Sequence, residues 1–336
     1  MRAGTRLSLW TERHRAQVRA RRSLSDLRAV TDRTASIQPT DILLCAAIRN
    51  EASRLPYLLT YYRALGVQHF LFIDNGSTDD SEQILSGQGD CSLWHTGASY
   101  KSSGYGMDWI NGILARHGRG HWVLTVDADE FFVYPHMDAR PLRALTDWLT
   151  ASRRRAFGAM LIDLYSDGPI AANACPPGQS PLSVLTHFDS GNYSYRRNAH
   201  YRNLWIQGGP RQRVFFADLP GDAPALNKVP LVRWTSRSVY ISSTHTLLPR
   251  RLNEVYDEKG GEHASGALLH TKFLSDFARK AREEADRGEH YADGWEYRIY
   301  VDKLDETANL WTPHSTRYTD WRQLDGLGLI STGDWA

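Results

Sequence analysis

In Val123-Leu124-Thr125-Val126-Asp127-Ala128-Asp129-Glu130-Phe131-Phe132, an apolar run changes abruptly into three carboxylates within four residues. The short run of apolar and β-branched residues predicts a buried strand. Because side chains alternate between the two faces of a strand, we expect Asp127 and Asp129 to point the same way. Such a carboxylate pair, with coordination positions left open, suits Mg²⁺ or Mn²⁺ bridging to phosphate oxygens. A polar turn after a buried strand is the alternative interpretation.

Two similar units precede this segment. An apolar run over residues 41–48 is followed by Arg49-Asn50-Glu51 and by an amphipathic helical pattern. A second apolar run, residues 69–73, leads into the turn sequence Asp74-Asn75-Gly76 and a further short helix. The order strand, helix, strand, helix, strand predicts an α/β fold with a largely parallel sheet. In such a sheet, ligands gather at the carboxyl ends of the strands.

These segments resemble a known family. Nucleotide-sugar glycosyltransferases of the GT-A fold carry three signatures that look like Ala47-Ile48-Arg49-Asn50-Glu51, Phe72-Ile73-Asp74-Asn75-Gly76-Ser77-Thr78-Asp79 and Val126-Asp127-Ala128-Asp129-Glu130-Phe131. The chain is most similar to the bacterial branch of the family 2 type, and it also resembles family 92 enzymes. The clear resemblance covers about residues 40–135. A looser one continues through Gly208-Gly209-Pro210-Arg211, Lys228-Val229-Pro230-Leu231-Val232-Arg233-Trp234, Ser243-Thr244-His245 and Leu269-His270-Thr271-Lys272.

The resemblance implies an α/β GT-A fold. It would have a Rossmann-like nucleotide-binding half, with a mixed, mostly parallel central sheet, and a C-terminal acceptor-side region. We therefore expect a basic N-terminal extension over residues 1–39 and a nucleotide-sugar-binding half over 40–135. Residues 136–336 would form the acceptor-binding half and a C-terminal wrap, continuous with 40–135 as one domain. The loop-rich stretch 166–228 is a natural place for acceptor binding.

Composition is that of an ordinary globular enzyme, with 41% hydrophobic and 23% charged residues. The three cysteines, Cys45, Cys91 and Cys175, lack metal-type spacing and favour a reducing compartment. No apolar stretch approaches the ~20 residues of a membrane helix, and the first residues lack a hydrophobic signal core. We therefore expect a cytoplasmic protein, and no nucleic-acid partner.

Charge is distributed unevenly along the chain. Residues 1–33 carry nine arginines against three acidic residues, whereas the net charge of the whole chain is only +2. This basic segment predicts peripheral contact with an anionic membrane, at the inner face of the cell membrane. A solvated N-terminal tail is the alternative interpretation.

The resemblance assigns nucleotide contacts to the ends of the first two predicted strands. Asp74 would accept a hydrogen bond from the base or ribose, and Arg49 would pair with the base or the diphosphate. Glu51 would orient Arg49 or cap the next helix. Ala47, Asn75 and Ala128 would complete the nucleotide site. For Asp74, a turn that needs no ligand is the alternative.

The same resemblance places a late histidine in the metal shell. The metal would be held by Asp127, Asp129 and His270, since neutral imidazole is a competent ligand for Mn²⁺. Lys272 would steady the departing diphosphate. A lone histidine is more often a hydrogen-bonded core residue, and this alternative stays open. Arg211 and Arg213 could grip an anionic ligand or lie at the surface.

A general base is harder to assign from sequence. Inverting transfer needs a carboxylate or an imidazole within hydrogen-bond reach of the acceptor hydroxyl. The catalytic candidates are Asp163 and His245, each at the end of a predicted strand, followed by Asp167 and Glu262. Their spacing does not rank them.

The sequence thus predicts a metal-dependent glycosyltransferase. It would move a sugar from a nucleoside-diphosphate donor, UDP-linked, to a glycan or lipid-linked hydroxyl acceptor in polysaccharide or glycoconjugate biosynthesis. The family resemblance favours inversion. A haloacid-dehalogenase-type phosphotransferase is one alternative, although that class carries its Asp-x-Asp on the first strand, followed by Thr or Val. A non-catalytic sugar-binding protein of the same fold is the other.

Overall fold

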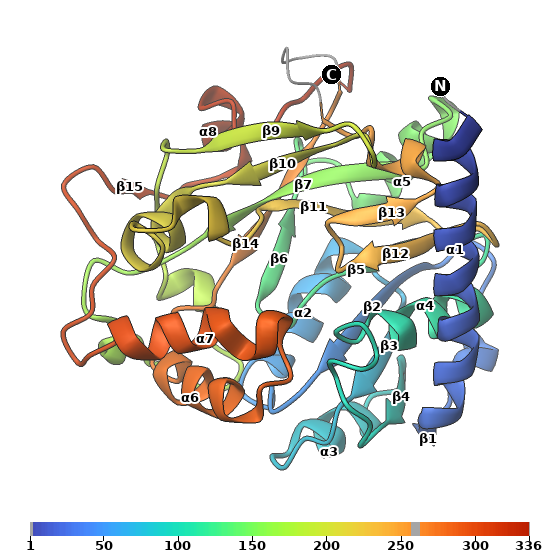
Figure 1. The fold of residues 1–336 in the computed structure, drawn as a ribbon, viewed down its shortest axis with the longest axis horizontal. Coiled ribbons are helices and arrows are strands. Elements are labelled where there is room, and N and C mark those ends of the chain that lie inside the picture. The colour runs from blue at the N-terminus through green and yellow to red at the C-terminus, as the bar shows by residue number, and fades with distance from the viewer. Residues whose placement is uncertain (1–2, 257–262, 336) are drawn as a thin grey trace.

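A single large sheet organises the protein (Figure 1). The computed structural model describes residues 3–256 and 263–335, so Glu262 lies outside the described residues. Within that part of the chain, nine strands pair side by side. Their order is β1 (Arg28–Thr31), β4 (Cys91–His95), β3 (His69–Asp74), β2 (Ile42–Ile48), β5 (Trp122–Thr125), β11 (Asn227–Arg233), β7 (Ala156–Asp163), β14 (Gly266–His270) and β6 (Glu130–Val133).

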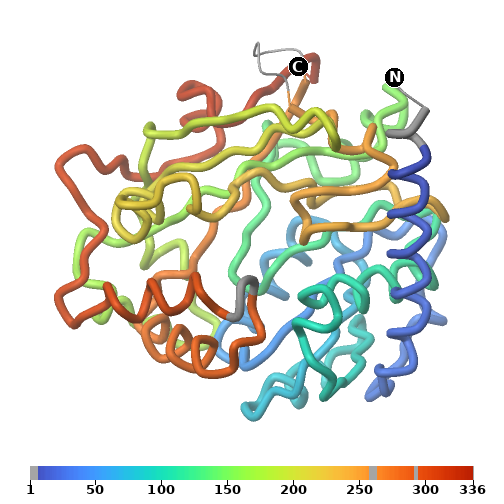
Figure 2. The backbone as a smooth tube through the Cα atoms, viewed as in Figure 1, coloured from blue at the N-terminus to red at the C-terminus, as the bar shows by residue number. Residues whose placement is uncertain are grey.

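The helices and the smaller strand pairs are arranged around this sheet (Figures 1 and 2). The helices are α1 (Ala3–Ser23), α2 (Leu55–Leu65), α3 (Ser81–Ser86), α4 (Met107–His117), α5 (Leu142–Ala151), α6 (Phe277–Arg287), α7 (Tyr291–Lys303) and α8 (Trp321–Gly326). The pairs are β9 (Ser194–Asn198) with β10 (Asn203–Gln207), β12 (Val239–Ser242) with β13 (Thr246–Leu248), and β8 (His187–Phe188) with β15 (Thr316–Arg317).

The sheet is mixed, and the expected α/β class is confirmed. The pairs β4–β3, β3–β2, β2–β5 and β7–β14 are parallel. The other four neighbouring pairs are antiparallel, so the sheet is evenly mixed and not mostly parallel. Strands from residues 40–135 and from residues 136–336 alternate within it, because β11, β7 and β14 lie between β5 and β6. The two expected halves therefore share one sheet.

The core lies on both faces of the sheet. In β2, Ile42 and Leu44 belong to the apolar cluster that includes α2 and α5, whereas Leu43 and Cys45 belong to the cluster that includes α4. This split follows from the alternation of side chains along a strand. A sheet covered on both faces needs continuous apolar strands, which explains the long apolar runs of the sequence. All three cysteines are free, and Cys45 is fully buried.

The N-terminal segment is part of the folded body. Strand β1 pairs with β4 at the edge of the sheet, and α1 packs along α4 and β12. Ala16 and Ala20 are buried against these elements. Residues 1–39 were expected to form a basic N-terminal extension, with a solvated tail as the alternative to membrane contact. The small alanines, spaced four residues apart on one face of α1, explain why the helix packs instead. None of the described helices combines the length and the apolar character needed to cross a bilayer.

The α1–α4 contact depends on Gly112. A Cβ added there would lie 2.6 Å from the carbonyl oxygen of Ala20 and 3.0 Å from the Leu24 Cδ2 atom. Alanine inside a helix ordinarily adds about 1 kcal/mol of stability over glycine. We expect Gly112→Ala to lower the free energy of unfolding by about 1–3 kcal/mol instead, because the two helices would be forced apart. Denaturant titration measures this, and Gly326→Ala in α8, where a Cβ meets open space, is the matched control. A stabilised Gly112→Ala would contradict the packing argument.

Candidate active site

The polar ends of most strands meet at one edge of the sheet. Asp74 ends β3, and Asp163 and His270 end β7 and β14. Glu130 begins β6 and pairs in register with His270. Lys228 lies near the start of β11, which runs antiparallel to β7. Several ionisable groups are thus concentrated at the edge where an α/β sheet binds its ligands.

The Asp-x-Asp segment lies in a turn and not in a strand. Strand β5 ends at Thr125, β6 begins at Glu130, and β11, β7 and β14 lie between them in the sheet. The chain therefore crosses the ends of three strands between these two residues. This corrects the prediction of a strand that ends in the Asp-x-Asp segment, with Asp127 and Asp129 on the same face. A single buried run looks alike in sequence whether it is one strand or two joined by a tight connection.

Asp127 and Glu130 share a buried lysine. The Lys228 Nζ atom lies 2.8 Å from Glu130 Oε1 and 3.3 Å from Asp127 Oδ2. Lys228 and Glu130 are almost fully buried, whereas the Asp127 side chain is 58% exposed. Burial raises the pKa of Glu130, although Lys228 acts in the opposite direction. The buried Glu130 carboxylate therefore needs the positive charge of Lys228, while the Asp127 carboxylate remains accessible to a ligand.

Asp129 begins a second chain of charges. Its Oδ2 atom lies 3.2 Å from His270 Nε2, and His270 Nδ1 lies 2.6 Å from Asp163 Oδ1. The other oxygen of Asp163 accepts from Arg211 Nε at 2.8 Å. Burial opposes a charge on His270, but Asp129 and Asp163 outweigh it and raise its pKa to about 9. Burial likewise opposes ionisation of Asp163, but Arg211 and His270 hold its pKa at about 2.

The expected metal ligands come together only in part. Asp129 and His270 are adjacent, but Asp127 faces Lys228. Among the described residues, a trio of potential ligands within 4.8 Å of one another occurs instead at Asp74, Glu82 and His95. There, His95 Nδ1 lies 3.2 Å from an oxygen of each carboxylate.

The expected nucleotide residues at β2 and β3 hold the turns beside them. Arg49 Nη1 donates to the carbonyl oxygens of Asn75 and Gly76 at 2.7 and 3.0 Å. The buried Asp74 carboxylate accepts from the backbone N–H and the hydroxyl of Ser77, as in the alternative turn interpretation. The Asn75 amide donates to the Ala98 carbonyl at 3.0 Å. Together these contacts fix the loops where a nucleotide is expected.

The remaining expected nucleotide residues differ in their surroundings. Ala47 lies at the end of β2 beside Gly106, and Ala128 is buried in the core cluster. Glu51 does not orient Arg49 in this structure. Its carboxylate pairs with Lys280 at 2.8 Å and with Arg54 at 3.2 Å, so it joins the start of α2 to α6.

Lys272 lies among aromatic rings of α6 and α7. Its Nζ atom is 4.8 Å from the centre of the Tyr297 ring and 5.2 Å from that of Tyr300, and Glu296 is 3.9 Å away. Burial raises the pKa of Asp129, but His270 and the nearby cations together lower it by more. Lys272 is one of these cations, with a smaller effect on the pKa of Asp129 than His270. The lysine is therefore positioned to act on charge at the Asp129 end of the turn.

The candidates for the general base are unequal. Asp163 is buried, with each oxygen engaged by a cation, so it serves to position His270 and not to meet an acceptor. His245 is partly exposed and donates from Nδ1 to the Asn227 carbonyl at 2.6 Å. Burial and Lys228 lower the pKa of His245 to about 3, so its imidazole stays neutral at physiological pH. Asp167 is exposed in the loop after β7.

Several residues of the site carried no assigned role from sequence. Lys228 was quoted within a motif, and a lone lysine inside an apolar strand signals a buried charge that needs a partner. Arg211 was weighed as a ligand contact, but it is buried beside Asp163. Arg54, which pairs with Asp276 at 3.0 Å, and Glu296 and Tyr297 of α7 gave no local signal. Glu296 and Tyr297 reach the site through the packing of α7, and Arg54 reaches it from the start of α2.

Comparison with known proteins identifies one distant relative. Over 106 residues the chain is 26% identical to a glycosyltransferase family 92 protein of Ricinus communis. The matched stretch is 29% of this chain and 18% of that protein, so the chain spans less than a fifth of its relative's length. No protein-family model matches the chain. The similarity is distant and partial, and it points to glycosyltransferases at the level of the family.

Lys228 is expected to be essential for stability. Lys228→Met leaves the Glu130 carboxylate buried without its cation, which typically costs about 3–5 kcal/mol of unfolding free energy. The double variant Lys228→Met/Glu130→Gln should recover most of that loss, because no buried charge is left unpaired. Asp127→Asn, at an exposed partner, should change stability by less than about 1 kcal/mol. Chemical denaturation of the three proteins tests this, and equal losses in the single and double variants would contradict it.

His245 gives a pH dependence with a definite sign. Its folded pKa, about 3, lies below the value of about 6.5 in an unfolded chain, so only the unfolded state takes up its proton between these values. Neutral His245 thus contributes stability above pH 6.5 that is lost as the pH falls, by up to about 1.4 kcal/mol per pH unit. We expect His245→Asn to show a shallower loss between pH 6.5 and 4. Identical pH profiles for the parent and the variant would rule this out.

Proposed function

We propose that this protein is a metal-dependent glycosyltransferase that moves a sugar from a nucleoside-diphosphate donor, UDP-linked, to a hydroxyl acceptor. One observation carries the proposal. The chain from Asp127 to Asp129 crosses the ends of β11, β7 and β14, where Lys228, Asp163 and His270 lie. An accessible carboxylate pair at this edge, beside a fixed imidazole, suits a diphosphate held through a divalent cation. The distant glycosyltransferase relative supports the same reaction class.

The groups at Asp129 would fit a metal such as Mn²⁺ or Mg²⁺ that displaces the proton held between His270 Nε2 and Asp129, because the ligand form of histidine is the neutral imidazole. With bonds of roughly 2.1 Å at right angles, neighbouring ligand atoms lie roughly 3 Å apart, and Asp129 Oδ2 and His270 Nε2 are 3.2 Å apart. The hydrogen bond from His270 Nδ1 to Asp163 fixes the ring, as second-shell carboxylates do at many metal sites. Asp127 would complete the protein's share. Such a metal neutralises charge on the leaving diphosphate.

The chain's own residues account for the rest of the reaction. Arg49 and Asn75 shape the loops that would receive the nucleotide. Lys272, beside Tyr297, would add positive charge near the departing diphosphate. For inversion, His245 is the better base candidate because its side chain is partly exposed, whereas cations engage both oxygens of Asp163. We place the acceptor, a glycan or lipid-linked hydroxyl of glycoconjugate or polysaccharide synthesis, on the side of residues 136–336.

Binding of UDP with and without Mn²⁺ tests the proposal. We expect calorimetry to show tight binding only when the metal is present, because the carboxylates at the site repel a bare diphosphate. Asp129→Asn should weaken UDP binding in the presence of Mn²⁺ at least tenfold and abolish sugar transfer. Its thermal unfolding should change little, since the Asp129 side chain is 23% exposed. Equal affinity with and without Mn²⁺ would refute the metal role.

His270→Ala provides the matched comparison. If His270 is a metal ligand, the variant loses Mn²⁺-dependent UDP binding. Asp167→Asn, in the exposed loop after β7, should bind like the parent. Screening of nucleotide sugars with the parent protein separates an enzyme from a non-catalytic sugar-binding protein, which would bind a donor without releasing the nucleoside diphosphate.

A further inference from the structure

The solvent-facing side of α1 combines cations with exposed apolar side chains. Leu7 and Trp10, one turn apart near the start of the helix, are 66% and 54% exposed. Arg15, Arg21 and Arg22 follow along the helix and are also exposed. We call these five residues the α1 face. An exposed leucine alone needs no explanation, but a tryptophan beside it on a strongly basic helix is typical of surfaces that contact lipid.

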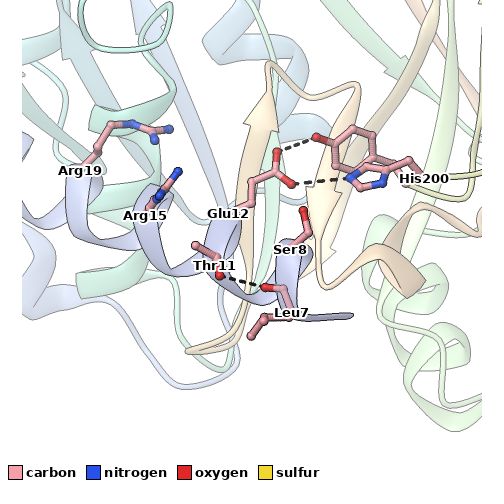
Figure 3. Close-up of a pocket in the computed structure, with 8 residues that line it drawn as sticks. Leu7, Ser8, Thr11, Glu12, Arg15, Arg19 and His200 are labelled. Carbon is pink, nitrogen blue, oxygen red and sulfur yellow. Dashed lines mark hydrogen bonds and ion pairs between the residues drawn. The ribbon is translucent and has the colours of Figure 1, made fainter. Parts of the chain in front are cut away.

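A groove beside the α1 face adds to its positive character (Figure 3). It lies between α1 and the turn that joins β9 to β10. Glu12 is its acidic residue, and that carboxylate accepts from the Tyr201 hydroxyl at 2.5 Å and lies 4.0 Å from His200 Nε2. Arg15 forms no ion pair with any described residue, and Arg19, although paired with Asp108, remains 53% exposed. The groove thus presents guanidinium groups to solvent.

The α1 face is held rigidly. Arg19 Nε donates to the buried Asp108 carboxylate at 3.0 Å, and Gln17 Nε2 donates to the Ser236 carbonyl at 2.8 Å. Ala16 and Ala20 are buried on the opposite side of the helix. The arginines and the apolar pair are therefore presented together, without the ordering cost that a disordered tail would bear on binding.

We propose that the α1 face is a docking surface for a membrane rich in anionic phospholipid. The arginines match the negative surface potential of such a membrane, and tryptophan prefers the headgroup level. Leu7 and Trp10 would enter the interface. A soluble polyanion would engage the arginines but would gain nothing from the apolar pair, which is why the membrane is the better match.

Docking through α1 leaves the candidate active site open. Helix α1 runs along one end of the molecule, whereas α6 and α7 lie toward the other end (Figure 1). The region of α6 and α7 supplies Asp276, which pairs with Arg54, and Tyr297, which contacts Lys272. Membrane attachment is thus a property separate from the proposed reaction, and it can be measured without any donor or acceptor.

Sedimentation with lipid vesicles tests the proposal on the full chain. We expect binding to vesicles of phosphatidylcholine mixed with phosphatidylglycerol, none to phosphatidylcholine alone, and weaker binding as salt is raised. The triple variant Arg15→Ala/Arg21→Ala/Arg22→Ala should lose roughly fivefold in affinity per arginine, about a hundredfold in all. The variant Leu7→Ser/Trp10→Ser should release the vesicles at lower salt than the parent.

A charge-matched control separates the face from net charge. Arg155→Ala/Arg282→Ala/Arg317→Ala removes three exposed arginines elsewhere and should bind vesicles like the parent. Thermal unfolding of all variants checks that they are folded. Three results would overturn the proposal: no binding of the parent to anionic vesicles, equal losses in the two triple variants, or binding to soluble heparin without binding to vesicles.

Discussion

Charge compensation at one edge of the sheet is the constraint on which the rest of the structure depends. Glu130 and Asp163 lie there with little access to water, and buried carboxylates are tolerated only when cations and hydrogen bonds satisfy them. Lys228 pairs with the carboxylate of Glu130, while His270 and Arg211 pair with the carboxylate of Asp163. The three cations come from residues that are far apart in sequence, so the edge forms only when the strands are in register.

The order of the strands explains this arrangement. Because β11, β7 and β14 insert between β5 and β6, one short turn passes over the ends of three strands. Lys228 in β11, Asp163 at the end of β7 and His270 at the end of β14 lie beneath it. Asp127 contacts Lys228 of β11, the first of these strands, and Asp129 contacts His270 of β14, the last of them. The two carboxylates therefore have different partners and different exposure, which one continuous strand would not allow.

The sequence predicts the strands and turns that local patterns encode. It does not predict the contacts that depend on which strands pair and in which register. The apolar runs that end at Ile48, Asp74 and Asp163 are strands, and their shared edge follows from βαβ order. The split of residues 123–132 into two strands is not visible locally, because both are apolar. Lys228 and Asp127 are 101 residues apart in sequence, and Arg211 and Asp163 are 48 apart, so no local spacing reveals these pairs. The packing of α1 depends on small residues that look unremarkable in a charged helix.

Exposure divides the charged residues of this edge into two kinds. Glu130, Lys228, Asp163 and Arg211 are buried and already paired, so a ligand gains little from them and their loss mainly damages the fold. Asp127 and Asp129 keep accessible carboxylate surface, and their partners leave oxygen lone pairs unused. A diphosphate–metal complex would thus meet a rigid frame whose electrostatic balance is set by the buried pairs. Preorganisation of this kind lets a few accessible groups bind charge without rearrangement of the sheet.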